Sequence, residues 1–451
     1  MAEWSVISIS RLDSSVRVNP EYFRPTYQKL EEDLRYSDPI PLVRIADITD
    51  GIHTSPDVDE TGVTYISAKC VKPDHFDIDD ALKISRVQNE RNPRTQLREG
   101  DVIITTVGTI GNAAVVPTEI LPANCDRHVG IIRVKQSSLL SPHYLSVFLN
   151  SKYGYFQSKK HTAGNVQPNL YIESIKKILV PRMPTQERQI TELAEEGYRQ
   201  RKEADNLFKQ AQSLLESELG LDKLAFDKPV SYTARFSEVA ASHRLDAGHY
   251  RPRYAQLIQH LKQGQWAYLG QLAEKNWRGV QPVYVEDGEV DVVNSQHLGR
   301  QHLDYDAFAK TARAAFVANP EAHIRYGDIL IYSTGAYIGR TNVYLSDKPA
   351  LASNHVHIVR LRGDIDPAYM AMVLSSPVGA FQTEKHARGS AQAELYPSDI
   401  AKFVVPLIDP DKQKAIGDLV RESLAAQQES KRLLEQAKHR VEALIEEAIA
   451  A

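Results

Sequence analysis

The sequence contains the stretch Leu97-Arg98-Glu99-Gly100-Asp101-Val102-Ile103-Ile104, and a similar stretch occurs a second time. The second copy reads Ile324-Arg325-Tyr326-Gly327-Asp328-Ile329-Leu330-Ile331, and its numbering is displaced by 327 − 100 = 227. Each copy turns at Gly-Asp and continues into an apolar, largely β-branched run, which is typical of a buried strand. The sequence therefore predicts the same turn and strand in two places.

Other landmarks recur at nearly the same displacement. They are Arg24–Tyr27, which returns as Arg251–Tyr254, His128–Val134, which returns as His355–Leu361, and Gly154–Gln157, which returns as Gly379–Gln382. Solenoid repeats have periods of roughly 20–50 residues, so this much longer period indicates a duplicated domain. A duplicated domain implies a molecule with two equivalent working ends.

Length and composition agree with two large domains plus connectors. At about 150 residues per domain, 451 residues correspond to about three units. The 42% apolar and 25% charged residues are ordinary for a globular protein. No apolar run approaches the roughly 18 residues that a membrane span needs, and the acidic Glu3 does not fit a signal peptide. We expect a cytoplasmic protein.

The two cysteines, Cys70 and Cys125, both lie in the first half and have no counterparts in the second. They form no CxxC pair and no cluster with histidine. We therefore expect two buried thiols rather than a disulfide, and no metal site.

Within each half the residue pattern changes once, from one typical of short strands to one typical of a long helix. Short strand-like runs include 101–107, 130–134 and 178–180, and helical patterns over 22–34 and 142–157 are interspersed in the same half. This mixture predicts an α+β fold rather than regular alternation. Proline-free stretches then follow from Thr185 to Leu219, before the helix-stopping Gly220, and from Lys412 to the C-terminus.

The two proline-free stretches carry apolar stripes at close to 3.5-residue spacing. The stripe positions that we expect to form a helix-pair or partner interface are Ile190, Ala194, Phe208, Leu215, Ile416, Val420, Leu434, Val441 and Leu444. Helices of about 35 and 40 residues reach roughly 50–60 Å, longer than a domain of about 180 residues is wide. Each stripe must be buried, and the other helix is the simplest partner. The alternative is that each helix packs only on its own domain.

The predicted architecture is therefore α+β, with two similar globular domains separated by two long antiparallel coiled-coil helices in an internal pseudo-twofold duplication. The domains occupy residues 1–184 and 222–409, and the helices occupy residues 185–221 and 410–451.

Signals for an enzyme are weak in this sequence. Asn19-Pro20-Glu21-Tyr22 resembles a damaged amino-methyltransferase motif, and its counterpart in the repeat is Asp246-Ala247-Gly248-His249. Pro410-Asp411 with Glu429-Ser430-Lys431 fits a nuclease pattern by letter, but the last three fall inside a predicted helix. The glycine turns at 108–111 and 335–339 lack a Walker lysine. No catalytic constellation recurs in both copies.

Polar side chains beside glycine do recur, in segments that read as loops. Residues 160–169 parallel residues 385–394, with His, Gly and Gln in the same places and other polar positions changed. Arg, Asn and Gln present the hydrogen-bonding geometry that distinguishes bases in the DNA major groove. Capped surface loops are the alternative interpretation. The net charge of −4 and the pI of about 6.4 favour DNA binding less than a basic chain would.

The order of several motifs resembles the specificity subunit of type I restriction–modification systems. The motifs are Asp50–Pro56, Gly62–Lys69, Leu97–Gly111, Gln167–Leu170, and Ile178–Pro181 leading through Pro184 into Gln186-Glu187 and Ile190. In that family a target-recognition domain is followed by a long helix, and the unit occurs twice. The second copy departs from the pattern at 278–282 and at Lys412-Gln413. The residue roles that the resemblance implies therefore transfer less directly to the second copy.

The resemblance implies a non-catalytic subunit that reads double-stranded DNA. Each domain would read one half of a bipartite site, and the helix pair would act as a ruler for the unread gap. The helices would also bind two methyltransferase subunits, which bring S-adenosylmethionine, and a restriction and translocase subunit would bring ATP and Mg. This chain itself would hold no cofactor. The alternative is a two-headed scaffold or adaptor that binds proteins and has no DNA sequence preference.

The candidate DNA-binding residues lie on the predicted loops of both copies. They are His53, Thr54, Ser55, Lys69, Thr109, Asn112, Arg127, His161, Asn165, Gln167 and Asn169 in the first copy, and Arg278, Gln281, Tyr337, Arg340, Asn354, His386, Arg388, Ser390 and Gln392 in the second. We expect no catalytic residues and no metal ligands.

Overall fold

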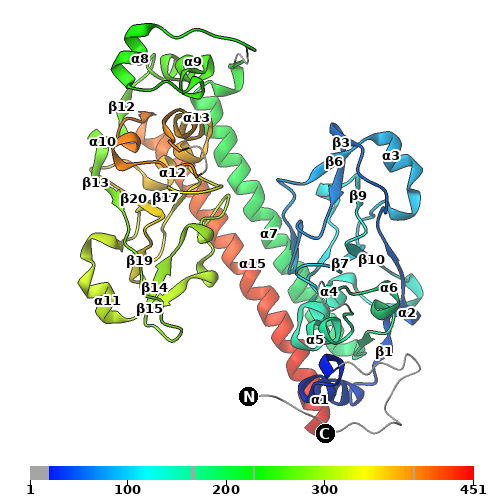
Figure 1. The fold of residues 1–451 in the computed structure, drawn as a ribbon. Helices are drawn as coiled ribbons and strands as arrows, with labels where there is room; N and C mark the ends of the chain where they lie inside the picture. Colours follow the sequence, from blue (N-terminus) through cyan, green and yellow to red (C-terminus); the bar gives the residue numbers. More distant parts are fainter. Residues whose placement is uncertain (1–19, 164–167, 227–228, 390–391, 451) are drawn as a thin grey trace. The chain divides into compact units, whose positions relative to one another are not determined.

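The structure is a computed structural model, and it describes residues 20–163, 168–226, 229–389 and 392–450 (Figure 1). The contacts divide the chain into two compact units. Unit 1 comprises Met1–Gln200 and Gln428–Ala451, and unit 2 comprises Arg201–Gln427. Each unit thus joins one globular head to a part of each long helix.

A four-stranded antiparallel sheet forms the centre of unit 1. Its strands, in spatial order, are β2 (Ala46–Asp50), β10 (Val129–Val134), β7 (Val102–Thr105) and β8 (Ala113–Val115). Strand β7 is the predicted strand of the repeated stretch, and all four of its residues are buried. The sheet is therefore anchored by that stretch.

Smaller sheets complete unit 1. They are β6 (Leu82–Ile84), β3 (Val58–Ile66) and β9 (Ala123–Cys125), then β1 (Ile40–Pro41) with β11 (Leu179–Val180), and β4 (Val71–Lys72) with β5 (His75–Phe76). The pair β3–β9 is parallel. Cys70 and Cys125 are free and buried, as predicted.

The helices of unit 1 apart from the long ones are short. They are α1 (Pro25–Arg35), α2 (Leu42–Ile45), α3 (Arg86–Arg91), α4 (Pro142–Asn150), α5 (Lys152–Lys160) and α6 (Ile172–Ile175), with 3-10 turns η2 (Pro20–Phe23), η3 (Pro93–Thr95), η4 (Thr118–Ile120) and η5 (Gln136–Ser138). The helical text over 142–157 forms two helices because the chain bends at Ser151, whose side chain caps α5. A Cβ on Gly154 would lie 2.3 Å from the carbonyl oxygen of Phe148, so the bend requires glycine there.

The central sheet of unit 2 has the same strand order as that of unit 1. Its strands are β13 (Ala273–Arg278), β20 (Val356–Leu361), β17 (Ile329–Tyr332) and β18 (Thr341–Val343). The register also repeats. Val129 faces Thr105 in unit 1, and their counterparts in the repeat, Val356 and Tyr332, face each other in unit 2. The sequence repeat therefore has a structural counterpart in the central sheets.

A second sheet and a strand pair complete unit 2. The sheet is β15 (Ala309–Thr311), β14 (Val290–Val293), β19 (Ala350–Ala352) and β16 (His323–Ile324), and the pair is β12 (Trp266–Tyr268) with β21 (Val404–Pro406). The pair β14–β19 is parallel, like β3–β9 in unit 1.

The shorter helices of unit 2 surround these sheets. They are α8 (Phe236–Ser242), α9 (Pro252–Leu261), α10 (Leu269–Leu272), α11 (Arg313–Ala318), α12 (Pro367–Ser375), α13 (Pro377–His386) and α14 (Pro397–Ile400), with 3-10 turns η6 (Leu221–Lys223), η7 (Ala247–Tyr250), η8 (Ser295–His297), η9 (Tyr305–Ala307) and η10 (Pro320–Ala322).

The two proline-free stretches form the long helices α7 (Pro184–Glu218) and α15 (Pro410–Ala450). Their bounds agree with the predicted ones to within two residues at three of the four ends, and the C-terminal Ala451 lies outside the described residues. Gly220 follows the end of α7 with φ +64°, a conformation that glycine adopts without strain. The nuclease-like Glu429-Ser430-Lys431 lies inside α15, as predicted.

Inside each unit the two long helices pack on each other and on the head. In unit 1 a Cβ on Gly197 would lie 2.8 Å from Cγ of Leu434, so the helices approach closely there. In unit 2 the Ser423 hydroxyl donates to the Ala204 carbonyl at 2.7 Å, and Lys412 forms an ion pair with Glu218 at 2.5 Å. The start of α15 thus meets the end of α7, so the helices are antiparallel in unit 2.

The apolar stripes belong to the head cores as well as to the helix pair. Eight of the nine predicted stripe residues are buried, and Phe208 is half-buried. The core of unit 1 includes Ile190 and Val441 together with β7 and β10 side chains, and the core of unit 2 includes Leu215 and Ile416. The two burial alternatives that the sequence left open are therefore combined. No described helix is long and apolar enough to cross a membrane.

Candidate nucleic-acid interface

One end of each central sheet carries a set of loops held by the same backbone hydrogen bonds. In unit 1 the amide of Thr106 donates to the His128 carbonyl at 3.0 Å, and the amide of Leu170 donates to the Thr106 carbonyl at 2.9 Å. In unit 2 the corresponding bonds join Ser333 to His355 at 3.0 Å and Leu395 to Ser333 at 2.9 Å. Every partner in unit 2 is the repeat counterpart of its partner in unit 1, so the two loop sets are equivalent.

Isolated β-bridges pin the end of the polar loop beside the central strand. Asn169 bridges both Val107 and Ala163, and Glu394 bridges both Thr334 and Arg388. A residue held by two bridges has a fixed backbone, so its side chain starts from a defined point. Asn169 and Glu394 therefore occupy the same position in the two units.

Glycine is required where the first loop passes the strand end. A Cβ on Gly51 would lie 2.2 Å from the Asp126 carbonyl oxygen, and a Cβ on Gly279 would lie 2.2 Å from the Ala352 carbonyl oxygen. Such distances exclude any side chain without movement of the backbone. This close approach brings the residues after Gly51 and Gly279 alongside the other loops.

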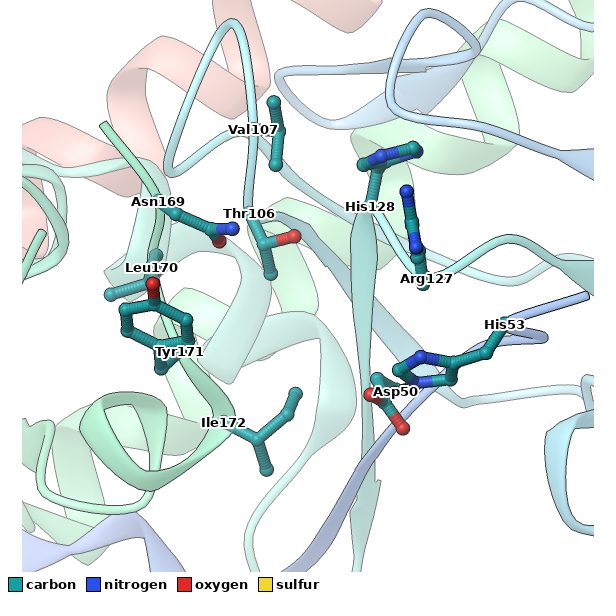
Figure 2. Close-up of a pocket in the computed structure, with 10 residues that line it drawn as sticks. All are labelled: Asp50, His53, Thr106, Val107, Arg127, His128, Asn169, Leu170, Tyr171 and Ile172. Carbon is teal, nitrogen blue, oxygen red and sulfur yellow. Dashed lines mark hydrogen bonds and ion pairs between the residues drawn. The ribbon is translucent and has the colours of Figure 1, made fainter. Parts of the chain in front are cut away.

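The loop set of unit 1 surrounds a cavity of about 360 Å³ (Figure 2). Its lining residues come from four chain segments: Asp50, His53, Thr106, Val107, Arg127, His128, Asn169, Leu170, Tyr171 and Ile172. Figure 2 shows His53 and Asp50 together on one side and Asn169 beside Thr106 on the other. The predicted candidates His53, Arg127 and Asn169 are thus brought together.

Two acids of this loop set pair with basic side chains. Asp50 lies 2.6 Å from Nε2 of His53 and 3.2 Å from Nη1 of Arg94, and Asp126 lies 3.0 Å from Nδ1 of His128. Among the described residues, none hydrogen-bonds the side chains of Arg127 or Asn169. An exposed guanidinium and an amide are therefore available to a ligand at this surface.

The equivalent surface of unit 2 has a different chemistry on the same frame. Arg278 ends β13 where Asp50 ends β2, and its guanidinium donates to the Leu395 carbonyl at 3.3 Å. It lies 3.7 Å from the Glu394 carboxylate and 5.1 Å from the centre of the Tyr396 ring. The Tyr396 hydroxyl donates to Glu394 Oε2 at 2.5 Å, and this bond raises the pKa of Tyr396. Arg278 and Tyr396 together orient the carboxylate.

Arg388 is held by a buried acid. Its Nη2 lies 2.8 Å from Oδ1 of Asp399, whose side chain is 2% exposed, and Lys402 lies 3.6 Å from the same oxygen. These residues border a cavity of about 450 Å³ that is also lined by Arg244, Arg251, Lys385 and His386 among others. Burial lowers the pKa of His386 to about 4 and lowers that of Lys385. Half of the Arg388 side chain remains exposed, so it can still meet a ligand.

The structure places the other candidates of unit 1 around the loop set. Thr54 and Ser55 are exposed and receive hydrogen bonds from the Gln88 amide at 3.3 and 2.9 Å. Lys69 lies exposed in the turn after β3, outside the cavity. Three further candidates make mainly structural contacts. The Thr109 carbonyl accepts from the Thr105 hydroxyl, and Asn112 donates to the Val71 carbonyl at 3.3 Å. The half-buried His161 ring lies 5.7 Å from the Tyr22 ring.

The remaining candidates of unit 2 divide in the same way. Arg340 lies over the exposed Tyr337 ring at 4.2 Å and donates to the Leu298 carbonyl at 3.2 Å. Gln281 and Gln392 are exposed, and Asn354 is half-buried. Asn165, Gln167 and Ser390 lie outside the described residues.

Several residues of this surface were not among the sequence candidates. They are Asp50, Arg94, Asp126, His128, Tyr171, Glu394 and Tyr396. Tyr171 and Tyr396 are 54% and 37% exposed, and they have the same numbering offset as Gly154 and Gly379. That repeat of an exposed tyrosine just after the polar loop was a signal in the sequence. Arg94 could not be found this way because it reaches Asp50 from a separate turn.

Residues 45–209 match the family model described as the type I restriction modification DNA specificity domain. This part of the chain is therefore similar to that domain. The matching model is that of type I restriction–modification systems, which is the family that the motif resemblance predicted. No curated protein matches the chain.

Three solved structures resemble the chain at low identity. The S subunit of a type I restriction–modification system from M. genitalium has 10% identity, a TM-score of 0.44, and coverage of 91% of this chain and 95% of that one. The HsdS subunit from Thermoanaerobacter tengcongensis has 16% identity, a TM-score of 0.29, and coverage of 91% and 95%. A structure titled for complex assembly of the type I R-M system has 16% identity, a TM-score of 0.30, and coverage of 91% and 96%. The similarity to the family rests on the model that matches residues 45–209.

Proposed function

We propose that this chain is a specificity subunit that reads a bipartite DNA site, with one half-site for each unit. The observation that carries the proposal is the equivalent loop set, whose backbone hydrogen bonds recur while its exposed side chains differ. Arg127 and Asn169 in unit 1 correspond to Asn354 and Glu394 in unit 2. A shared frame with different polar groups suits two readers of two different base sequences.

The cations around the loops supply the second requirement of DNA binding. Phosphate contacts give affinity without sequence information, and exposed Arg and Lys side chains make them. Unit 2 groups Arg251, Lys385, Arg388 and Lys402 beside its polar loop. The overall charge of −4 does not oppose this, because local charge decides contact with a phosphate.

In this proposal the chain is not an enzyme. It binds methyltransferase subunits and a restriction and translocase subunit, and those subunits bring S-adenosylmethionine, ATP and Mg. The helix pair is the proposed binding surface and spaces the two half-sites. The competing proposal, a scaffold that binds only proteins, is favoured by no contact described above, but it is testable in the same experiment.

The test is selection from a library of random DNA duplexes by the full-length protein, alone and in complex with its methyltransferase subunits. We expect two enriched half-sites at one fixed gap. Arg127→Ala should relax base preference in one half-site only, and Asn354→Ala in the other only, each by about 1–3 kcal/mol. A scaffold would enrich no sequence. Binding of equal strength to every duplex would also overturn the proposal.

A further inference from the structure

The position shared by Asn169 and Glu394 is held by equivalent backbone contacts in both units. Two β-bridges hold it in each unit, and one of them joins it to Val107 in unit 1 and to Thr334 in unit 2, just past the ends of β7 and β17. An exposed tyrosine follows two residues later in both units, at Tyr171 and Tyr396. The two units therefore carry different side chains at one equivalent backbone position, and the chemistry of these two side chains can be compared.

The two side chains differ in what they can bind. The Asn169 amide both donates and accepts, whereas the Glu394 carboxylate only accepts. An amide can bond N6 and N7 of adenine together, and a carboxylate can accept from the N4 amino group of cytosine. The bases that the two groups select are therefore different.

A carboxylate at a DNA surface needs a donor, because the phosphates around it are also negative. Glu394 is one-third exposed, so its charge is not removed from the surface by burial. Arg278 at 3.7 Å and the Tyr396 hydroxyl at 2.5 Å hold the carboxylate without enclosing it. The carboxylate keeps further acceptor capacity, which suits an exocyclic amino group of a base and not a phosphate.

The arrangement around Glu394 adds a second contact to the same base pair. Arg278 stands beside the carboxylate, and its guanidinium is oriented by the Leu395 carbonyl and the Tyr396 ring. Arginine pairs with O6 and N7 of guanine, the partner base of cytosine. Adjacent Glu and Arg side chains thus match the two bases of one C·G pair.

We infer that residues 169 and 394 are specificity-determining residues, such that Asn169 selects adenine at one position of the first half-site and Glu394 selects cytosine at one position of the second. The inference rests on the proposed function, since it names the bases that each unit distinguishes. It goes beyond that function because it assigns one base preference to one residue in each unit.

The experiment is duplex selection with the full-length protein and its Glu394→Gln and Asn169→Asp variants. Both substitutions are nearly isosteric. We expect Glu394→Gln to change one position of the second half-site from cytosine to adenine, by roughly 5- to 150-fold in relative affinity. Asn169→Asp should change one position of the first half-site from adenine towards cytosine. In each variant the other half-site should stay unchanged.

The matched control is Glu422→Gln, which removes an exposed carboxylate of unit 2 on the long helix α15, and it should alter neither half-site. If wild-type protein selects a bipartite site but neither variant changes a base preference, the inference fails and the proposed function stands. A uniform loss of affinity in Glu394→Gln, with base preferences kept, would show that Glu394 only anchors Arg278. If wild-type protein selects no sequence, both the inference and the proposed function fail. Asn169→Asp remains an independent test if Glu394→Gln does not fold.

Discussion

The aspartate of the repeated Gly-Asp turn is buried and paired with an arginine of the neighbouring strand. Asp101 is 3% exposed and lies 3.0 Å from Nε of Arg133, and Asp328 is fully buried and lies 2.7 Å from Arg360. Both acids also accept from the amide three residues earlier, at 2.9 and 2.7 Å. These residues hold the turn against the sheet, so the repeated motif is structural and lies outside the candidate loop surface.

Removing the buried acid should destabilise unit 2 strongly. Asp328→Asn leaves Arg360, whose side chain is 13% exposed, without a counter-charge, and loss of one partner of a buried pair costs about 3–5 kcal/mol in other proteins. We expect a loss of about 3 kcal/mol in the free energy of unfolding, measured by urea denaturation. The control Asp291→Asn breaks the more exposed pair with Lys310 and should cost under about 1 kcal/mol. Equal losses in the two variants would contradict this assignment.

At the scale of elements, a histidine connects a loop of the second head to the helix pair in unit 2. His302 Nε2 lies 2.8 Å from the Ser423 hydroxyl on α15, and that hydroxyl donates to the Ala204 carbonyl on α7. The His302 ring packs edge-on against Phe208 at 5.5 Å. Burial lowers the pKa of His302 to about 4. One side chain thus joins a loop, α7 and α15.

This contact should make unit 2 sensitive to acid. The folded-state pKa lies below the unfolded value of about 6.5, so below that value the unfolded chain binds the proton more readily. The contribution of neutral His302 to the free energy of unfolding is complete above a pH of about 6.5. It is lost as the pH falls towards about 4, by up to about 3 kcal/mol. Urea denaturation of wild-type protein and His302→Gln at several pH values measures it. The variant does not titrate, so the difference in stability should shrink as the pH falls, and parallel pH curves would refute the prediction.

At the scale of the whole molecule, a fragment that ends near Gly220 keeps one head and one long helix. It loses the residues of α15 that pack with Ile190 and Ala194 in the core of unit 1. We predict that two copies associate through α7 into a symmetric dimer that binds an inverted repeat of the first half-site. Sedimentation at micromolar concentration measures the association. A monomeric fragment would count against helix pairing as the organising contact.

The long helices should also set the gap in the DNA site. Deleting seven residues within Glu192–Leu215 and seven within Leu419–Leu444 removes about 10 Å from each helix and keeps the stripes in phase. DNA rises about 3.4 Å per base pair, so the preferred gap should shrink by roughly three pairs. Binding should weaken as well, because three pairs rotate one half-site by nearly a third of a turn. Selected half-site sequences should not change, and an unchanged gap would reject this role of the helices.

Much of the fold was predictable because its signals are local. The Gly-Asp turn before β7, the proline-free stretches of α7 and α15, and the stop at Gly220 follow from residue types and spacing alone. The repeat adds a second observation of each element. For this reason the sequence by itself predicted the α+β class, the duplication and the family model that residues 45–209 match.

The site was decided by contacts between distant segments. Asn169 and Glu394 reach their common position through β-bridges to Val107 and Thr334, which come much earlier in the chain, and Arg388 is tied to the buried Asp399. The stripes of α7 and α15 also join the head cores, which their periodicity cannot show. Long-range hydrogen bonds and burial depend on where the chain crosses itself, and only the tertiary structure specifies those crossings.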